Sequence, residues 1–355
     1  MADDIAKLRG EIDAIDDALA RQIGQRASLA RRIGALKAGG AAYRPEREAP
    51  ILRRVGEAAG ELGAERMTGI FREIISACRG LEEAISVSYL GPQGTFSEQA
   101  VRKHFGRGVQ ALAAASVDEA FRSCESGAAQ FTVVPVENST EGAVGRTLDL
   151  LLATPLRVCA EIELRIRQNL LSKERELAGV RRIYSHAQSL AQCNGWIAQH
   201  LPHAERVAVV SNAEAAQRAS REAGSAAIAG EAAAQLYGLE MLARAIEDEP
   251  TNTTRFLVLG NLDAAPTGKD RTSIVASAEN RPGAVHALLT PIAKHGVSMT
   301  RIESRPSRSR TALWEYVFFI DLEGHRQDEA VAKALAALKA QVPYLKILGS
   351  YPVAA

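Results

Sequence analysis

The sequence has few cysteines, no excess of charge and no long apolar run. It contains only four cysteines, and no two form a Cys-x-x-Cys pair, so neither a disulfide framework nor a zinc site is indicated. Its 43 basic and 42 acidic residues nearly cancel, and no basic run is interleaved with aromatic residues, which argues against a nucleic-acid partner. No stretch approaches the ~20 apolar residues of a membrane helix, and the first ten residues lack a signal-peptide core. These absences predict a cytoplasmic protein with no membrane partner.

The sequence does contain enough apolar residues for more than one core. With 355 residues, of which 46% are hydrophobic, two or three domains are expected. The residue pattern changes near residue 86 and again after a turn-like linker at 263–268. We therefore predict three domains, over residues 1–85, 86–265 and 271–351.

The first segment has an all-helical pattern. Apolar residues recur every three or four positions along residues 3–38, which predicts one helix about 50 Å long. Pro45 suits the first turn of a second helix over 46–60, and a third is expected over 65–84. Two short helices cannot cover an apolar stripe of that length, so we expect a helical dimer, in which a second copy of the chain covers it.

Charged residues interrupt the apolar side of these helices. Arg26 falls in a row that is otherwise apolar, and Lys37 lies one turn beyond Ile33 on the same face. On the third helix Glu82 follows Cys78 by one turn. An unpaired charge buried in such packing costs on the order of several kcal/mol, so several of them together favour a charged ligand. For any one residue the alternative is an internal salt bridge or a side chain that reaches the helix edge.

These residues occur in an order that resembles the all-helical chorismate mutase family over residues 1–85. The resemblance implies two intertwined chains, with Arg9 crossing into the partner's site, and rearrangement of chorismate to prephenate without a cofactor or metal. At Arg44 this chain departs from relatives that carry an acid, and the role of Arg44 stays open. The matching pieces are Leu8-Arg9, Gln25-Arg26, Lys37, Tyr43-x-Pro45-x-Arg47-Glu48 with Ile51-Leu52, and Glu82.

The resemblance also assigns roles within that site. Arg26 and Arg47 would pair with the substrate carboxylates, because the planar guanidinium matches a carboxylate bidentately, and Glu48 would hold a hydroxyl. Lys37 and Glu82 would be catalytic and donate to the ether oxygen, which for Glu82 requires the protonated form that apolar surroundings favour. The residues assigned to chorismate are Arg9, Arg26, Lys37, Arg47, Glu48, Cys78 and Glu82.

The second segment alternates short β-type runs with helices, which predicts α/β architecture. Polar loops follow several of the runs, and α/β folds place ligand sites at such loops. For each loop taken alone, a capped turn is the alternative. The expected strands are 87–90, 132–135, 157–162, 183–185, 207–210, 226–229 and 255–259.

Four polar loops, in order, resemble prephenate dehydratase over about residues 87–262. They are Gly91-Pro-x-Gly-Thr-Phe-Ser97, Val134-Pro-x-Glu-Asn-Ser139, Tyr184-Ser-His-x-Gln188 and Asn252-x-Thr-Arg-Phe256. The resemblance implies two lobes like those of a periplasmic binding protein, the second from about 165 to 246, with prephenate in the cleft. Loss of carbon dioxide and of the ring hydroxyl makes the ring aromatic, so the protein need only position the carboxylates and help hydroxide leave.

By that resemblance Thr254 is the catalytic residue and hydrogen-bonds the departing hydroxyl. Arg255 could meet a substrate carboxylate or anchor its own strand. Glu137 ranks below Thr254 as an acid, because a loop carboxylate is commonly a helix cap, and His186 is expected to be a satisfied turn residue. The residues assigned to prephenate are Asn138, Ser139, Ser185, Gln192, Thr254 and Arg255.

The third segment predicts a ferredoxin-like α+β fold. Its pieces Arg281-Pro-Gly-Ala-Val-His-Ala-Leu-Leu289 and Glu303-Ser-Arg-Pro306 resemble the ACT domain, a regulatory amino-acid-binding module, and within it the phenylalanine motifs of dehydratases. Alternatively, Glu303 forms an ordinary ion pair with Arg301 or Arg305. The expected elements are strand 272–278, helix 283–295, strands 297–304 and 312–321, helix 327–340 and strand 345–350.

What the ACT resemblance implies is feedback inhibition by L-phenylalanine, which would bind one arrangement of paired ACT modules better than another. The glycine that opens the helix leaves backbone N–H groups free for a carboxylate. The residues assigned to phenylalanine are Gly283, Ala284, Val285, His286, Glu303, Ser304, Arg305 and Pro306.

Three rival interpretations stay open. A non-catalytic sensor would join a two-lobed binding domain to an amino-acid module, but Thr254 in its Thr-Arg-Phe context favours an enzyme. A dehydratase with a decayed mutase is disfavoured by the retained Arg9, Arg26 and Lys37. A third interpretation replaces prephenate with its aminated analogue, arogenate. In each case the expected partners are small molecules and further copies of the chain.

Overall fold

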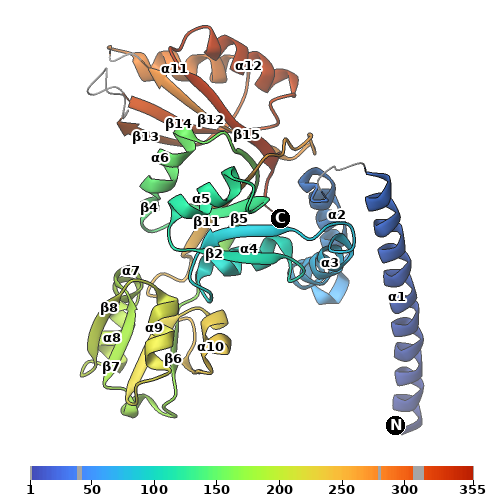
Figure 1. Ribbon diagram of the computed structural model, residues 1–355, viewed down its shortest axis with the longest axis vertical. Coiled ribbons are helices and arrows are strands. Elements are labelled where there is room, and N and C mark those ends of the chain that lie inside the picture. The colour runs from blue at the N-terminus through green and yellow to red at the C-terminus, as the bar shows by residue number, and fades with distance from the viewer. Residues whose placement is uncertain (1, 38–41, 279–280, 307–315, 355) are drawn as a thin grey trace.

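The computed structural model describes residues 2–37, 42–278, 281–306 and 316–354. The chain forms a helical part, a two-lobed α/β part and a C-terminal α+β part, in that order (Figure 1). Within the described ranges, no helix combines the length and the apolar character needed to cross a membrane.

The helical part consists of α1 (Ala2–Leu36), α2 (Pro45–Glu57) and α3 (Ala64–Arg79). Pro45 occupies the first turn of α2, where its missing N–H costs no helix hydrogen bond. The predicted second and third helices are too long at their C-terminal ends, because α2 ends before a short 3-10 turn and α3 ends at a turn at Gly80. Most of α1 stands apart from the rest of the molecule, and its large apolar side chains are 40–86% exposed (Figure 1).

The two-lobed part has two sheets. The chain leaves the first lobe after β5, builds the second lobe, and returns to the first on β11, as the sequence predicts. Its helices are α4 (Phe96–Phe105), α5 (Val117–Glu125), α6 (Gly145–Ala153), α7 (Ala187–Gln192), α8 (Asn194–His200), α9 (Asn212–Ala219) and α10 (Glu231–Tyr237).

The first sheet has the order β2-β1-β3-β11-β5, with β4 added to β3, and the second has the order β10-β6-β9-β7-β8. All seven predicted strands are confirmed. β2, β4, β6 and β10 were not predicted, because they are short or rich in alanine and leucine rather than in β-branched residues. The first sheet contains β1 (Ser86–Leu90), β2 (Gln110–Ala114), β3 (Phe131–Asn138), β4 (Gly142–Ala143), β5 (Arg157–Arg165) and β11 (Thr253–Gly260). The second contains β6 (Asn169–Ser172), β7 (Arg182–His186), β8 (Glu205–Val209), β9 (Ser225–Ala229) and β10 (Glu240–Ala243).

The C-terminal part has the predicted ferredoxin-like arrangement, an antiparallel sheet of order β13-β14-β12-β15 carrying two helices. The predicted strand 312–321 begins outside the described residues, and the described strand continues to Glu323. The elements are β12 (Asp270–Ala278), α11 (Ala284–Lys294), β13 (Met299–Pro306), β14 (Tyr316–Glu323), α12 (Glu329–Lys339) and β15 (Leu345–Pro352).

Both faces of this C-terminal sheet are buried. Phe318 and Ile320 pack with α11 and α12, whereas the alternate residues Val317 and Phe319 join the core of the first lobe. At Gly349 a Cβ atom would lie 2.0 Å from the carbonyl oxygen of Val158, so only glycine lets β15 approach β5 this closely. The C-terminal part and the first lobe therefore share one continuous hydrophobic core.

The helical part is joined to the first lobe through Tyr43, which is 1% exposed. Its ring packs against Phe105 and Phe131, and its hydroxyl lies 2.5 Å from Nε2 of His104. Arg79 adds a hydrogen bond of 2.7 Å from its guanidinium to the carbonyl of Phe105. The junction is thus a buried polar and aromatic cluster.

This junction is expected to weaken in acid. Burial, together with Arg72 and Arg79, lowers the pKa of His104 to about 3. The unfolded chain, with an ordinary histidine pKa of about 6.5, therefore binds a proton that the folded chain excludes, and stability falls by about 1.4 kcal/mol per pH unit below pH ~6.5. We expect His104→Gln to remove this loss in calorimetry between pH 6.5 and 5.5. His200→Gln, at an exposed helix end, is the matched control, and equal acid sensitivity of all three proteins would contradict the assignment.

Candidate active sites

A cavity of about 780 Å³ lies between the two lobes. Residues of the first lobe line one side, from the loop after β1, the β3–β4 turn and the start of β11. Residues of the second lobe line the other side, from the end of β7, from α7 and from the loop before α9. This is the crevice beyond strand ends where α/β folds bind ligands.

Thr254 and Asn138 form a hydrogen-bonded pair in the wall of this cavity. Nδ2 of Asn138 lies 2.8 Å from Oγ1 of Thr254. The orientation of the Asn138 amide is fixed, because its Oδ1 accepts from the backbone N–H groups of Thr140 and Glu141 at 3.1 and 3.2 Å. The Thr254 oxygen therefore accepts from Asn138, and its own proton is left to donate to a ligand in the cavity.

Gln192 and Asn252 extend this polar network across the cleft. Asn252, only 1% exposed, accepts from Asn138 at 2.8 Å and donates to Oε1 of Gln192 at 2.9 Å. Gln192 in turn donates to Thr140 at 3.2 Å, which links the second lobe to the first. Of the residues predicted to bind prephenate, the structure therefore brings together Asn138, Gln192 and Thr254.

Three other predicted prephenate residues do not line the cavity. Ser185 is fully buried and donates to the carbonyl of Ile228 at 2.8 Å. Ser139 is exposed, and its hydroxyl accepts from the N–H of Thr253 at 3.0 Å. Arg255 corrects the expectation most clearly, because its side chain is held by other protein groups on the opposite side of β11 from the cleft. The structure thus favours the anchoring alternative for Arg255.

The helical part brings two of its predicted residues into contact. Nζ of Lys37, at the end of α1, lies 3.1 Å from Oε2 of Glu82, just after α3. A Cβ atom on Gly34 would lie 3.1 Å from the Cα of Glu82, so α1 approaches this turn closely. Glu82 therefore has a cation beside it rather than the apolar surroundings that the sequence analysis assumed.

The carboxylate of Glu48, which was expected to hold a substrate hydroxyl, is instead hydrogen-bonded to a neighbouring arginine. Both of its carboxylate oxygens accept from Nη1 of Arg79, at 2.7 and 2.9 Å. Burial raises the pKa of Glu48, and Arg79 offsets only part of that rise. Glu48 also lines a smaller cavity of about 300 Å³ with Arg72, where the helical part meets α4 and the C-terminal tail.

The remaining predicted chorismate residues lie around the helices with different exposure. Arg26 is half-buried, and its charge acts on the pKa of Glu48. Arg47 and Arg9 are exposed, as expected for groups that await a substrate or a second chain. Cys78 is buried on α3. Arg44, 42% exposed, lies 3.7 Å from Glu46, a local pair that assigns it no substrate role.

The predicted phenylalanine residues lie on two elements of the C-terminal part. Gly283 precedes α11 with a φ of +77°, and Ala284, Val285 and His286 form the first turn of that helix. The second group, residues 303–306, ends β13. Neither Arg301 nor Arg305 needs Glu303 as its partner, because Arg301 pairs with Glu137 and Arg305 with Asp149, both in the first lobe.

Comparison with known proteins covers nearly the whole chain. Family models match residues 8–83 as chorismate mutase type II, 87–264 as prephenate dehydratase and 272–340 as an ACT domain. A bifunctional chorismate mutase/prephenate dehydratase from Neisseria gonorrhoeae is 50% identical over 98% of this chain and 96% of its own length. The chain belongs to the bifunctional chorismate mutase/prephenate dehydratase family.

Other members of this family and one solved structure agree with that assignment. The bifunctional enzyme of Pseudomonas aeruginosa is 48% identical over 99% of this chain and 98% of its own length. A prephenate dehydratase of Arthrobacter aurescens, solved in complex with L-Phe, is 36% identical with a TM-score of 0.70 and covers 76% of this chain and 90% of its own. The helical part is therefore the mutase domain, the two-lobed part the dehydratase domain and the C-terminal part the ACT domain.

Several residues of the two candidate active sites were not predicted from the sequence. Gln168 lines the dehydratase cleft and is 1% exposed, and its Oε1 has no hydrogen-bond partner in the described part of the chain. Asn212 also lines the cleft, and its Oδ1 accepts from Ser185 at 3.0 Å. Arg79 follows Cys78 on α3, but nothing in the helical periodicity marks it as a buried arginine. Of these four residues, only Asn252 could have been found from the sequence, because it is the first residue of the motif Asn252-x-Thr-Arg-Phe256.

Proposed function

We propose that this enzyme rearranges chorismate to prephenate in its mutase domain and converts prephenate to phenylpyruvate in its dehydratase domain, under feedback inhibition by L-phenylalanine. The observation that carries the proposal is the hydrogen bond from Asn138 to the Thr254 hydroxyl in the cleft wall. In this bond the Thr254 oxygen is the acceptor, so the Thr254 proton is available to the substrate. We divide the domains at residues 85/86 and between residues 265 and 271. The four cysteines, all buried and unpaired, are compatible with the expected cytoplasmic location.

In the dehydratase step the substrate ring supplies the driving force. The bond to the departing carboxylate breaks, its electron pair forms a ring double bond, and hydroxide leaves from the opposite end of the ring. A hydrogen bond from Thr254 stabilises the negative charge that develops on that hydroxyl oxygen. Asn138 contributes to this step because its amide donates to the Thr254 oxygen and does not accept the Thr254 proton. That proton is then directed toward the cleft. The products are phenylpyruvate, carbon dioxide and, after protonation, water.

In the mutase step one carbon–oxygen bond breaks as one carbon–carbon bond forms. No nucleophile is needed, so the domain acts by holding the substrate in its reactive shape and by stabilising charge on the ether oxygen. Lys37 and Glu82 are adjacent, and both would donate to that oxygen when Glu82 carries a proton. Arg26 and Arg47 would pair with the two carboxylates, and Cys78 would line the pocket.

We place L-phenylalanine between two groups of the ACT domain. The first turn of α11 suits the amino-acid carboxylate, because the first N–H groups of a helix lack helical partners, although the N–H of Ala284 already donates to the carbonyl of Arg281 at 3.1 Å. Residues 303–306 at the end of β13 form the second group. The related dehydratase solved with L-Phe supports this choice of ligand.

A homodimer formed through α1 completes the proposal. The helix exposes large apolar side chains along its whole length, from Ile5 at 50% to Leu36 at 86%. Apolar area of this extent is normally buried by another protein surface. A second copy supplies a matching helix, and Arg9, exposed near the N-terminus of α1, would then reach the partner's site. Whether two such dimers associate further is a separate question for the same measurement.

Replacing Ile15, at 59% exposure, with glutamate is expected to dissociate the dimer. A carboxylate in the apolar seam loses hydration without gaining a partner, so the variant should have the mass of one 38.0 kDa chain in analytical ultracentrifugation and weak mutase activity. Ser28→Glu introduces the same charge on the opposite side of α1 and should leave the wild-type mass unchanged. If both variants keep the wild-type mass, α1 is not the dimer seam.

The most direct test of the two activities is to add chorismate alone to the pure protein. Phenylpyruvate should form, with prephenate as the intermediate, because one chain carries both domains. Prephenate accumulation without phenylpyruvate would contradict the dehydratase assignment, and no reaction with chorismate while prephenate is consumed would contradict the mutase assignment. Substituting arogenate for prephenate distinguishes the two dehydratase substrates.

A further inference from the structure

The dehydratase residues Asn138 and Thr254 each have a chain neighbour that faces the ACT domain. β3 and β11 are antiparallel neighbours, in which Asn138 lies opposite Thr254 and Glu137 lies opposite Arg255. Successive side chains of a strand point to opposite faces, so the first pair faces the cleft and the second pair faces away from it. On each strand, therefore, the residue that faces the cleft is next in sequence to a residue that faces the ACT domain.

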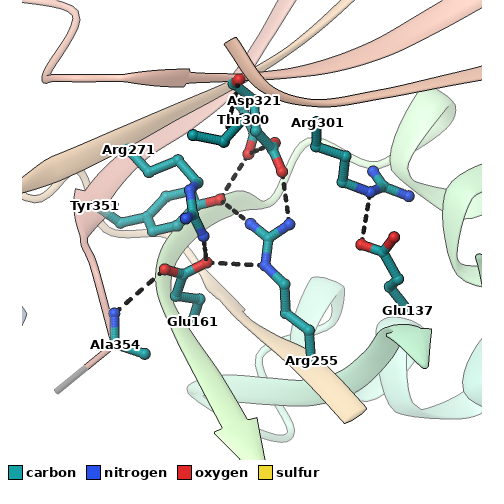
Figure 2. A network of polar contacts seen from close by, with 10 residues as sticks. Glu137, Glu161, Arg255, Arg271, Thr300, Arg301, Asp321, Tyr351 and Ala354 are labelled. Atoms are coloured by element: carbon teal, nitrogen blue, oxygen red, sulfur yellow. Dashed lines mark hydrogen bonds and ion pairs between the residues drawn. The ribbon is translucent and has the colours of Figure 1, made fainter. Parts of the chain in front are cut away.

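Arg255 is held mainly by the ACT domain, as Figure 2 shows. Nη1 donates to Oδ2 of Asp321 on β14 at 2.5 Å, and Nη2 donates to the hydroxyl of Tyr351 on β15 at 3.0 Å. Nε donates to Glu161 on β5 at 2.8 Å, and Glu161 also accepts from Arg271 of the ACT domain. The Arg255 side chain is 12% exposed and the Asp321 side chain 6%. Each of the three side-chain nitrogens of this buried arginine has a partner, so a movement that breaks one contact leaves a buried polar group unpaired, at a cost in free energy.

Glu137 also contacts the ACT domain, through one ion pair with a different strand, and its side chain is 36% exposed. Nε of Arg301 on β13 lies 2.7 Å from its Oε2, an ion pair whose N–H is not aligned as a hydrogen bond (Figure 2). Four residues further along β13, Arg305 donates to Asp149 on α6 at 3.1 Å. Arg301, Glu303 and Arg305 alternate with more exposed residues, so they share the face of β13 that meets the dehydratase domain.

We propose that Glu137 and Arg255 are positioning residues, through which the ACT domain sets the Asn138–Thr254 hydrogen bond. β13 carries both Arg301 and the residues 303–306 assigned to L-phenylalanine. A ligand that shifts β13 therefore moves the partner of Glu137, and β3 carries that movement one residue along to Asn138. This inference rests on the dehydratase and phenylalanine sites proposed above and adds the route that connects them.

Two features of the structure favour coupling between the ACT domain and the Asn138–Thr254 pair. The ACT domain and the first lobe share one hydrophobic core, so the two domains do not slide freely over each other. The pairing of β3 with β11 shifts register just beyond Arg255, so a local irregularity adjoins the Glu137–Arg255 pair. Such bulges allow a strand to re-aim a side chain.

The test compares Arg301→Gln and Glu137→Gln with the wild type in the full-length enzyme. We expect each variant to lower the dehydratase kcat and to weaken the maximal inhibition by L-phenylalanine, each by about 3- to 30-fold. KM for prephenate should change less than about 2-fold, and the Kd for L-phenylalanine from isothermal titration less than about 3-fold. The double variant should be no worse than either single variant, because both remove the same contact. Arg301→Lys should restore part of the lost kcat.

Arg326→Gln is the matched control. Arg326 is also an ACT arginine, and it pairs at 2.7 Å with Asp263, which follows the end of β11 that is opposite Thr254. It should change neither kcat nor inhibition. The mutase rate of every variant reports on folding and concentration. Unchanged kcat and inhibition in Arg301→Gln and Glu137→Gln, additive effects in the double variant, or equal effects of Arg326→Gln would each overturn the proposal.

Failure of this inference is distinguishable from failure of the proposed function. If Thr254→Val leaves the dehydratase intact, the catalytic assignment is wrong. If Thr254→Val removes activity while Arg301→Gln behaves as the wild type, only the positioning route is wrong. If L-phenylalanine does not bind the wild type, the ligand assignment is wrong, but the effect on kcat still tests whether Arg301 positions the pair.

Discussion

Replacing Thr254 with valine is expected to lower the dehydratase kcat on the order of 10²- to 10³-fold, with little change in KM. Valine keeps the shape of threonine but has no hydroxyl, so the developing charge on the leaving oxygen loses its hydrogen-bond donor. Asn138 keeps its bond of 2.8 Å to Asn252, so the cleft wall should stay folded. The measurement is the rate of phenylpyruvate formation from prephenate.

Thr253→Val provides the matched control for this substitution. The Thr253 hydroxyl donates to the carbonyl of Thr251 at 3.0 Å and does not line the cleft, so its loss should leave kcat within about 2-fold. Thr254→Ser should retain most activity, because serine supplies the same donor. A Thr254→Val enzyme as active as Thr253→Val would remove Thr254 from the mechanism.

Local patterns in the sequence were sufficient to predict most of the fold. Short β-type runs predicted β5 and β11, each of which is buried over five consecutive residues, and the periodicity of α1 predicted its length to within two residues at each end. β2, with the sequence Gln-Ala-Leu-Ala-Ala, was missed because alanine favours helices, and only pairing with β1 makes it a strand. Tertiary context therefore decided the elements that propensity could not.

Site residues could be predicted where a sequence motif identifies them. They could not be predicted where the role depends on contacts with residues distant in sequence. Thr254 stands out in its motif, but the direction of its proton depends on the amide of Asn138. Arg255 adjoins it in sequence and points the other way, because the ACT domain covers that face of β11. Similarly, the sequence places Glu48 near the mutase site, but it does not show that Arg79 occupies the carboxylate.

Replacing Lys37 with alanine is expected to lower the mutase kcat/KM on the order of 10²- to 10³-fold while the dehydratase keeps its rate. Two groups 45 positions apart in sequence, Lys37 and Glu82, meet at 3.1 Å, and their donors serve the ether oxygen of the substrate. Removing the ammonium takes away one of the two donors proposed for that oxygen. The measurement is the loss of chorismate, followed in parallel with phenylpyruvate formation from added prephenate.

The Lys37 prediction distinguishes catalysis from a merely structural ion pair. A structural pair would also be broken by Glu82→Gln, which removes the charge but keeps a hydrogen-bond donor. If the pair only joins α1 to the turn after α3, both variants should be equally inactive and less stable. If the donors act on the substrate, Glu82→Gln should retain far more activity than Lys37→Ala at equal stability. Arg31→Ala, an exposed cation removed from the same helix, should match the wild type, because its charge lies outside the site.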